Sequence, residues 1–396
     1  MGDNNSQKIA HFKPLEYSQI PGWENDNHLQ ALNALLWSAK RTKEKPYKTK
    51  RLKVDASALN SILLKMLETD FDGFNSKQAA RNFFEKNFKP HLITSNGSTD
   101  KATDSFSGFV TAYFEPEVDA SKVQTDKYKY PILKRPADLV AINDDERPAS
   151  IGKTFFFARK LSKTNTNRFE TFPNRQQIET GALDKQGLEI YWFESKIDIF
   201  FIHIQGSARL ILKNEQGDNV IERISYDGKS GHEFTPIGKI LIERGEIERE
   251  EITMQSIREW LLTHSDQADA LMHENESFIF FQKIDHPEPK LGPVAASGVP
   301  LTPNRSLAID HKLQTFGAPI FISTKNPVGT DEKPFQKLMV AQDTGSAIVG
   351  SARGDLFIGT GEEAAKIAGA VKHPADFIIL LPKKASSTAH SDYEVV

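Results

Sequence analysis

The 396-residue sequence contains no cysteine, which excludes disulfides, zinc–thiolate sites, a cysteine nucleophile and a lipidated cysteine. The eleven histidines are scattered, and neither His-Glu-x-x-His nor Gly-x-Ser-x-Gly occurs. A complete glycine-rich nucleotide fingerprint is also missing. The sequence therefore predicts no metal site, no cofactor and no nucleotide.

Long apolar runs are absent as well. No stretch approaches the roughly 18 apolar residues that a membrane span needs, and residues 1–18 lack the apolar core of a signal peptide. Taken by itself, the sequence therefore predicts a cytosolic protein.

The chain has no basic excess, since its net charge is −3. Proteins that bind nucleic acid usually carry a strong positive charge, so we expect no nucleic-acid partner. One local exception is the lysine-rich run 40–53. We interpret it as a solvated loop, with a polyanion site as the alternative.

Hydrophobic periodicity divides the chain into helical and strand-like parts. Helical patterns are expected at Glu24–Lys43, Ala56–Glu68, Ser76–Phe88, Pro236–Arg244 and Thr253–Asn275. Short β-branched and aromatic runs predict strands at Gly108–Glu117, Tyr130–Lys134, Thr154–Ala158, Leu188–Phe193, Ile197–Gln205, Ala208–Leu212, Val220–Ile224, Phe278–Ile284, Ala318–Ile322, Leu338–Ala341 and Phe377–Leu381.

This order of helices, strands, helices and strands again indicates one domain interrupted by another. We expect residues 1–106 and 240–384 to form the first domain and residues 107–239 to be the insertion. Residues 385–396 are expected to be a disordered tail. Clefts between domains often bind ligands, so a groove is expected there.

Two carboxylates in Lys337–Gly361 are the strongest candidates for chemistry. Asp343 and Asp355 stand beside the apolar runs Leu338–Ala341, Ala347–Val349 and Leu356–Ile358, which have the content of short buried strands. A carboxylate at the end of such a strand is poorly solvated, so its pKa should rise toward the range of a general acid.

Asp343 also begins an Asp-Thr-Gly-Ser sequence, 343–346, of the kind found in aspartic proteases. That mechanism needs two carboxylates that share one proton, and the chain has no second such motif. A protease would therefore require a homodimer that brings two copies of Asp343 together.

Seven markers in order make the chain resemble the membrane-bound lytic murein transglycosylase A family, with its C-terminal three-aspartate domain. They are residues 108–117, 130–136, 174–183, 198–212, 226–247, 298–322 and 337–369. The resemblance implies a mainly β fold with accessory helices. In it, both chain ends form a double-psi β-barrel domain, a second β-barrel domain is inserted, and a glycan strand lies in the groove between them.

The resemblance also implies an activity. Asp355 matches the family's catalytic aspartate, which protonates the bond between N-acetylmuramic acid and N-acetylglucosamine and then accepts a proton from the sugar's 6-hydroxyl. Asp343 and Asp310 match the other two aspartates. We expect Asp343 to keep Asp355 protonated and Asp310 to shape the loop, while a purely structural role for both stays open.

Two polar alternations are candidates for sugar contacts. Thr111, Tyr113 and Glu115 would share one face of a strand, and Gln205, Ser207 and Arg209 would share a face of another. By resemblance both segments border the groove, together with Asp310. Polar alternation on a solvated sheet explains the same pattern without a ligand.

The leading hypothesis is thus a peptidoglycan lytic transglycosylase that acts as a monomer on glycan strands. The resemblance places it in the periplasm, with association to the outer membrane as a further expectation. A hydrolytic glycosidase on the same polymer and a non-catalytic glycan-binding protein are the alternatives.

Overall fold

The computed structural model describes residues 10–68, 76–95, 106–142, 147–152, 155–161, 168–285, 288, 290–329, 332–345 and 347–383. The expected tail at 385–396 and Ser346 lie outside these residues. The chain forms two compact units. The first comprises residues 1–114, 288–359 and 370–396, and the second comprises residues 115–287 and 360–369.

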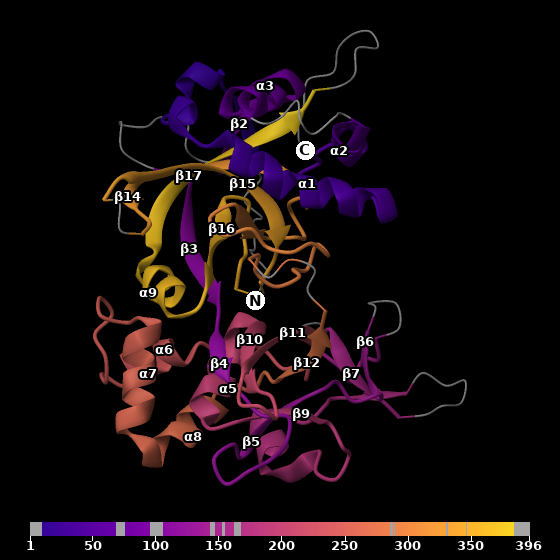
Figure 1. Ribbon diagram of the computed structural model, residues 1–396, viewed down its shortest axis with the longest axis vertical. Coiled ribbons are helices and arrows are strands. Elements are labelled where there is room, and N and C mark those ends of the chain that lie inside the picture. The colour runs from indigo at the N-terminus through magenta and orange to yellow at the C-terminus, as the bar shows by residue number, and fades with distance from the viewer. Residues whose placement is uncertain are drawn as a thin grey trace. The chain divides into compact units, whose positions relative to one another are not determined.

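The first unit is built on a sheet that closes into a ring (Figure 1). Its strands are β1 (Ala10–Pro14), β2 (Phe88–Ser95), β3 (Gly108–Glu115), β13 (Ser306–Ile309), β14 (Pro319–Pro327), β15 (Pro334–Asp343), β16 (Arg353–Thr360) and β17 (Lys372–Pro382). Six of them, in the order β3-β17-β14-β15-β13-β16, return to β3, and β2 and β1 extend the sheet from β17. The ring contains β3 from before the second unit and five strands from after it, which confirms a barrel built from both ends of the chain.

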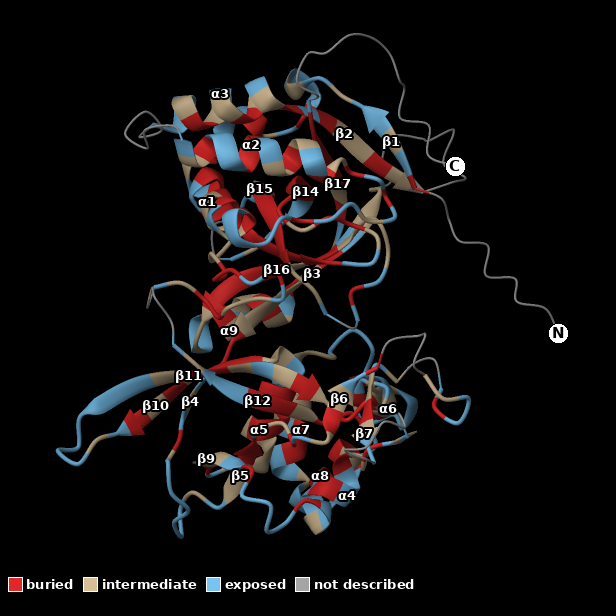
Figure 2. Cartoon of the chain, turned by 90° about the vertical axis from the view of Figure 1, so that its right-hand side faces the viewer, coloured by how far each residue is buried: buried red, intermediate tan, exposed pale blue. Residues whose placement is uncertain are grey.

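Three helices pack on this sheet: α1 (His28–Glu44), α2 (Ala56–Glu68) and α3 (Lys77–Asn87). The apolar residues of α1 recur at helical spacing, and Leu32 and Leu35 are fully buried. The core contains Leu338 of β15 and Ile378 of β17. Figure 2 shows these buried faces in red, with exposed residues on the other side of each helix. All three helices lie where their periodicity predicts them.

The second unit has three small sheets and seven helices among its described residues. Its strands are β4 (Glu117–Asp119), β5 (Tyr130–Leu133), β6 (Leu139–Ala141), β7 (Phe157–Lys160), β8 (Phe169–Glu170), β9 (Glu189–Phe193), β10 (Ser207–Lys213), β11 (Asn219–Lys229) and β12 (Ile279–Ile284). Its helices are α4 (Arg175–Gln177), the π-helical η5 (Ile178–Ala182), α5 (Lys196–Gln205), α6 (Ile237–Glu243), α7 (Met254–Thr263), α8 (Ser265–His273) and α9 (Glu362–Ala370). The sheets are β12-β11-β10-β4, β5-β9 and β6-β7-β8. The expected second barrel is therefore divided, among these residues, into three separate sheets.

The bounds of this unit differ from the expected insertion, 107–239. Residues 240–285 belong to it because β12 pairs with β11 and because α6, α7 and α8 share a hydrophobic core with α5. Residues 360–369 belong to it as well. A periodicity pattern shows where helices return but not which core they join.

Two predicted strands are absent. Residues 197–205 form most of α5, which begins at the N-cap Ser195 and ends at Gly206 in the left-handed conformation. Five consecutive residues of the helix, 199–203, are buried, so apolar side chains lie on several of its faces and the sequence has the composition of a buried strand. Residues 347–349 form a loop, in which Val349 is 72% exposed.

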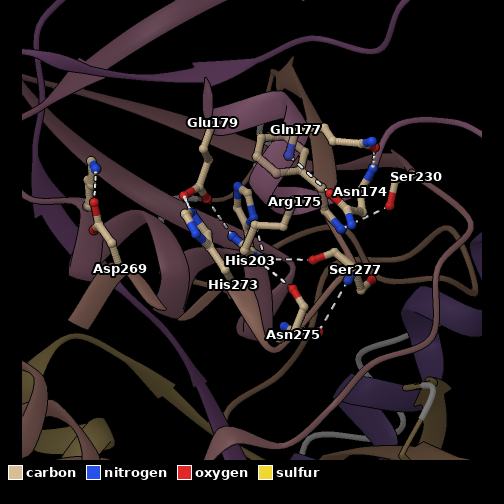
Figure 3. Close-up of polar contacts among 12 residues, drawn as sticks. Asn174, Arg175, Gln177, Glu179, His203, Ser230, Asp269, His273, Asn275 and Ser277 are labelled. Carbon is tan, nitrogen blue, oxygen red and sulfur yellow. Dashed lines mark hydrogen bonds and ion pairs between the residues drawn. The ribbon is translucent and has the colours of Figure 1, made fainter. Parts of the chain in front are cut away.

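The marker 174–183 surrounds a buried arginine of the second unit (Figure 3). The Arg175 guanidinium donates to the carbonyl oxygens of Asn275 and Ser277 and to the Glu179 carboxylate, at 2.9, 2.7 and 3.0 Å. It also contacts Nδ1 of His203 at 3.2 Å. A buried charge must be compensated, and these contacts do so for Arg175. The marker 174–183 therefore has a structural role.

A second buried charge holds the start of the chain to the barrel. Asp26, just before α1, pairs with Arg305, and both side chains are 2% exposed. Its carboxylate accepts two guanidinium hydrogen bonds of 2.8 and 2.9 Å and one from the backbone N–H of Leu338. Asp26 therefore links the N-terminal segment to β15.

Replacing Asp26 with alanine should destabilise the protein strongly, because it leaves the buried Arg305 unpaired. A loss of about 3–5 kcal/mol in the free energy of unfolding is expected, measured by urea denaturation. Glu24→Ala is the matched control, since Glu24 pairs with Arg81 at the surface and should cost about 1 kcal/mol or less. Equal losses in the two variants would contradict a special role of the buried pair.

Candidate active site

Strand pairing within the first unit brings Asp343 and Asp355 to one place. Ala308 of β13 pairs with Asp343 of β15 on one side and with Asp355 of β16 on the other. Residues paired across strands face the same side of a sheet. The β13–β15 register shifts at this point, and the hydrogen bonds of β3 show the shared face: Thr111 and Tyr113, two residues apart on that strand, donate to Asp355 and Asp343.

Asp355 is partly buried and is held by a neighbouring strand. Thr111 of β3 donates its hydroxyl proton to Oδ1 of Asp355 at 2.5 Å. The same hydroxyl oxygen accepts a hydrogen bond of 2.8 Å from Nη2 of Arg353. The guanidinium thus fixes the direction of the Thr111 hydroxyl, whose proton can only point to the carboxylate.

Asp343 ends β15 and is held by different partners. The Tyr113 hydroxyl donates to Oδ2 at 2.7 Å, and the backbone N–H of Ala296 donates to Oδ1 at 3.2 Å. The preceding residue, Gln342, is completely buried and bonded to Ser38 of α1, whereas Asp343 is only partly buried.

The surroundings shift the pKa values of Asp355, Asp343 and Tyr113, each through different neighbours. Burial raises the pKa of the Asp355 carboxyl to about 6, the Thr111 hydrogen bond and the Arg353 charge lower it, and the Asp343 charge raises it. Burial also raises the pKa of Asp343, while its hydrogen bonds lower it. Burial and the Asp343 charge raise the pKa of Tyr113 well above its usual value, so its hydroxyl keeps the proton that it donates.

Asp310 follows β13 directly and is buried. Its carboxylate accepts hydrogen bonds from the backbone N–H groups of Lys312 and Gly350, at 3.1 and 3.0 Å. Thr344 is tied to the same strand end through the carbonyl of Ile309. These contacts fix both ends of the loop that follows Asp343.

The other candidates lie in the second unit. Glu115 is completely buried, pairs with Arg223 at 3.1 Å and accepts a hydrogen bond of 2.7 Å from Thr360. These partners compensate the buried carboxylate within the chain. The role of Glu115 as a substrate contact stays a prediction.

Gln205, Ser207 and Arg209 do not share one strand face. Gln205 is the last residue of α5, and β10 starts only at Ser207, which is buried. The Arg209 guanidinium pairs with Glu117 at 3.2 Å. The alternation was inferred across a helix end, where the period of two does not apply.

Arg353 was missed by the sequence reasoning. It lies two residues before Asp355 on β16, so it is on the same face of the strand. Applying to β16 the alternation rule used for residues 111–115 would have found it. The described residues contain no group of three His, Asp or Glu side chains that could hold a metal ion.

Comparisons with known proteins agree with this architecture. Residues 109–282 match the model of the MltA specific insert domain, and residues 305–381 match that of the 3D domain. A membrane-bound lytic murein transglycosylase from Agrobacterium tumefaciens, solved by crystallography, has 40% sequence identity and a TM-score of 0.82. The comparison covers 94% of this chain and 97% of that one.

Other relatives are more distant. The crystal structure of MltA from Neisseria gonorrhoeae is 28% identical with a TM-score of 0.74, and covers 95% of this chain and 94% of that one. Membrane-bound lytic murein transglycosylase A from Vibrio cholerae is 32% identical over 66% of this chain. The chain spans 62% of the length of that curated relative. Among the described helices, none has the length and apolar character that a bilayer span requires.

The six-strand ring is thus the double-psi β-barrel that the resemblance implied, with the inserted unit between β3 and β13. Together with the two matched domain models, this fold identifies the chain as a member of the membrane-bound lytic murein transglycosylase A family.

Proposed function

We propose that the protein is a peptidoglycan lytic transglycosylase. It would cleave the β-1,4 bond between N-acetylmuramic acid and N-acetylglucosamine and leave a 1,6-anhydro end. The observation that carries the proposal is the partly buried Asp355, with a pKa raised to about 6 and a fixed hydrogen bond to Thr111. Membership of the family supports the choice of substrate.

In the proposed reaction Asp355 first acts as an acid. Its carboxyl proton moves to the bridging oxygen, and the bond between that oxygen and the anomeric carbon breaks. The 6-hydroxyl oxygen of the same muramyl residue then forms a bond to the anomeric carbon, and its proton moves to the Asp355 carboxylate. The acid is regenerated and no water is consumed, so one carboxyl group is sufficient.

Asp343 would support this acid and not attack the sugar. Both of its oxygens accept hydrogen bonds, from Tyr113 and Ala296, which hold a carboxylate where its charge raises the pKa of Asp355. These contacts within one chain also give no support to a protease that pairs two copies of Asp343.

The remaining candidates receive different proposed roles. Thr111 and Tyr113 position the two aspartates, and Asp310 fixes the loop between them. Glu115 joins the end of β3 to Thr360, the last residue of β16, and the backbone N–H of Gly361 donates to its carbonyl oxygen at 2.9 Å. It therefore holds together the two strands that carry Thr111 and Asp355. Gln205 and Arg209 stay candidates for contacts with the glycan.

A periplasmic location follows from the proposed substrate, and the relatives are named membrane-bound. We propose that the protein meets the glycan strands there as a monomer, since the Thr111–Asp355 and Tyr113–Asp343 hydrogen bonds show that one chain is sufficient to assemble the proposed site.

Asp355→Asn should abolish turnover and leave glycan binding intact, because the amide cannot transfer the proton. Loss of general acid–base function costs about 10²–10⁴-fold in rate. The measurement is release of muropeptides from purified sacculi, with sedimentation on the sacculi as the binding assay. Asp266→Asn, at an exposed position of α8, is the control. A folded Asp355→Asn enzyme with more than about a tenth of the activity would remove Asp355 from this role.

The contribution of Asp355 to the stability of the folded protein depends on pH. The folded-state pKa of Asp355, about 6, lies above its ordinary 3.8, so the folded protein binds this proton more tightly than the unfolded chain does. Its contribution is therefore largest below pH 4 and falls as the pH rises through 6. Asp355→Asn should thus melt at a higher temperature than the wild type at pH 7, with a smaller difference at pH 4.

Two neighbouring substitutions should move the pH profile in opposite directions. Asp343→Asn removes a charge that raises the pKa of Asp355, so the basic limb of the activity profile should move to lower pH. Thr111→Val removes a hydrogen bond that lowers the same pKa, so that limb should move to higher pH. The profiles of kcat/KM measure both shifts. Shifts of the same sign would show that Asp355 does not control the basic limb.

The source of the attacking oxygen separates lytic cleavage from hydrolysis. Intramolecular attack by the 6-hydroxyl benefits from a high effective molarity and incorporates no solvent oxygen. Digestion of sacculi in heavy-oxygen water should therefore give anhydro ends whose anomeric carbon is unlabelled, as read by mass spectrometry. Reducing ends labelled in the primary product would establish the hydrolytic glycosidase instead.

A further inference from the structure

The basic run 40–53 has an unusual local charge. Eight of its fourteen residues are lysine or arginine and only Glu44 is acidic, whereas the whole chain has a net charge of −3. Lys43, Lys45 and Lys48 are exposed, and their side chains form no ion pair with any residue that the structure describes. Their positive charge is therefore available to a partner.

The backbone of this run is held in place. It consists of the last turns of α1 and an extended connection to α2. Tyr47 and Leu52 are buried, and the backbone of Tyr47 exchanges two hydrogen bonds with the Asn60 side chain, of 3.1 and 2.9 Å. Leu52 donates a backbone hydrogen bond of 2.9 Å to Leu313. The lysines thus project from a fixed surface and not from a free loop.

That surface borders the candidate active site within the first unit. Leu313 lies three residues after Asp310, whose carboxylate holds the loop that follows Asp343. On the other side, the Arg41 guanidinium lies over the Tyr47 ring at 4.7 Å and beside Gly298. Gly298 follows Ala296, which donates its N–H to Asp343. Both loops that contact the site therefore touch the basic run.

We propose that residues 40–53 form a docking surface for the carboxylates of the peptides that hang from the glycan strand. The inference rests on the proposed function, since it assigns a further part of the same substrate to this surface. N-acetylglucosamine is neutral, and the carboxyl of a peptide-bearing N-acetylmuramic acid is an amide, so the negative charge of such a strand lies on its peptides. Lysine ammonium groups on flexible stems suit mobile carboxylates that present no single geometry.

An anionic phospholipid surface is the other polyanion that such a run could bind. The position of the run favours the peptides, because it adjoins the loops around Asp343 and peptides next to the cleaved bond would reach it. A membrane contact would need no such proximity to the site.

The test compares two triple variants with the same change in charge. Lys43→Gln, Lys45→Gln and Lys48→Gln neutralise the surface, whereas Lys77→Gln, Lys86→Gln and Lys89→Gln neutralise three other exposed lysines of the first unit. None of the six belongs to the catalytic machinery. Each triple is made in the wild type and in the inactive Asp355→Asn protein, and sacculi are used native or with their peptide carboxylates converted to amides.

Sedimentation of the inactive proteins measures binding without turnover. At about 0.01 M salt, where charges act over about 30 Å, the 43/45/48 triple should bind native sacculi three- to tenfold more weakly. It should bind amidated sacculi like its parent, and the control triple should match its parent on both. In the active proteins the same triple should raise KM on native sacculi and leave kcat unchanged.

Three results would overturn the proposal. They are an equal loss on amidated sacculi, an equal loss in both triples, and no loss on native sacculi. If the 43/45/48 triple instead loses only the binding to phosphatidylglycerol vesicles, the surface faces a membrane. Failure of the proposed function is separate, because it would appear as wild-type protein that binds sacculi but releases no anhydro product.

Discussion

The incomplete solvation of the Asp355 carboxyl is the constraint around which the site is arranged. Burial alone would raise its pKa further, and a carboxyl with a strongly raised pKa recovers a proton readily but donates one poorly. Thr111 and Arg353 favour the charged form and lower this pKa, whereas the Asp343 charge raises it, as burial does. The balance leaves the pKa at about 6, where both halves of a proton-transfer cycle are accessible.

That balance depends on strand pairing. Ala308 pairs with both Asp343 and Asp355, and β3 brings Thr111 and Tyr113 to these two carboxyls. Each aspartate then has its own hydroxyl donor. Hydroxyl hydrogen bonds thus lower the pKa of both groups. The Arg353 charge also lowers the pKa of Asp355, whereas backbone hydrogen bonds lower that of Asp343.

Much of this could be predicted from the sequence, and the failures have physical causes. Helices α1, α2 and α3 were found because each has one apolar face and one polar face, which gives a clear period. Helix α5 was missed because it is buried on nearly all sides, and a buried helix and a buried strand look alike. The two aspartates were found from their apolar neighbours. Arg353 and the buried state of Glu115 depend on which strands become neighbours, and local sequence does not state that.

The ring also determines at which point of chain synthesis the candidate active site can form. Thr111 and Asp355 are 244 residues apart in the chain, and β17, which pairs with β3, comes later still. At synthesis rates of about 5–20 residues per second, β3 must wait roughly 12–50 seconds for its partner strands. Residues 115–287 of the second unit are made during that interval, whereas residues 360–369 follow Asp355. A growing chain therefore carries no assembled acid until β16 has been made, and the ring closes only after β17 has followed it.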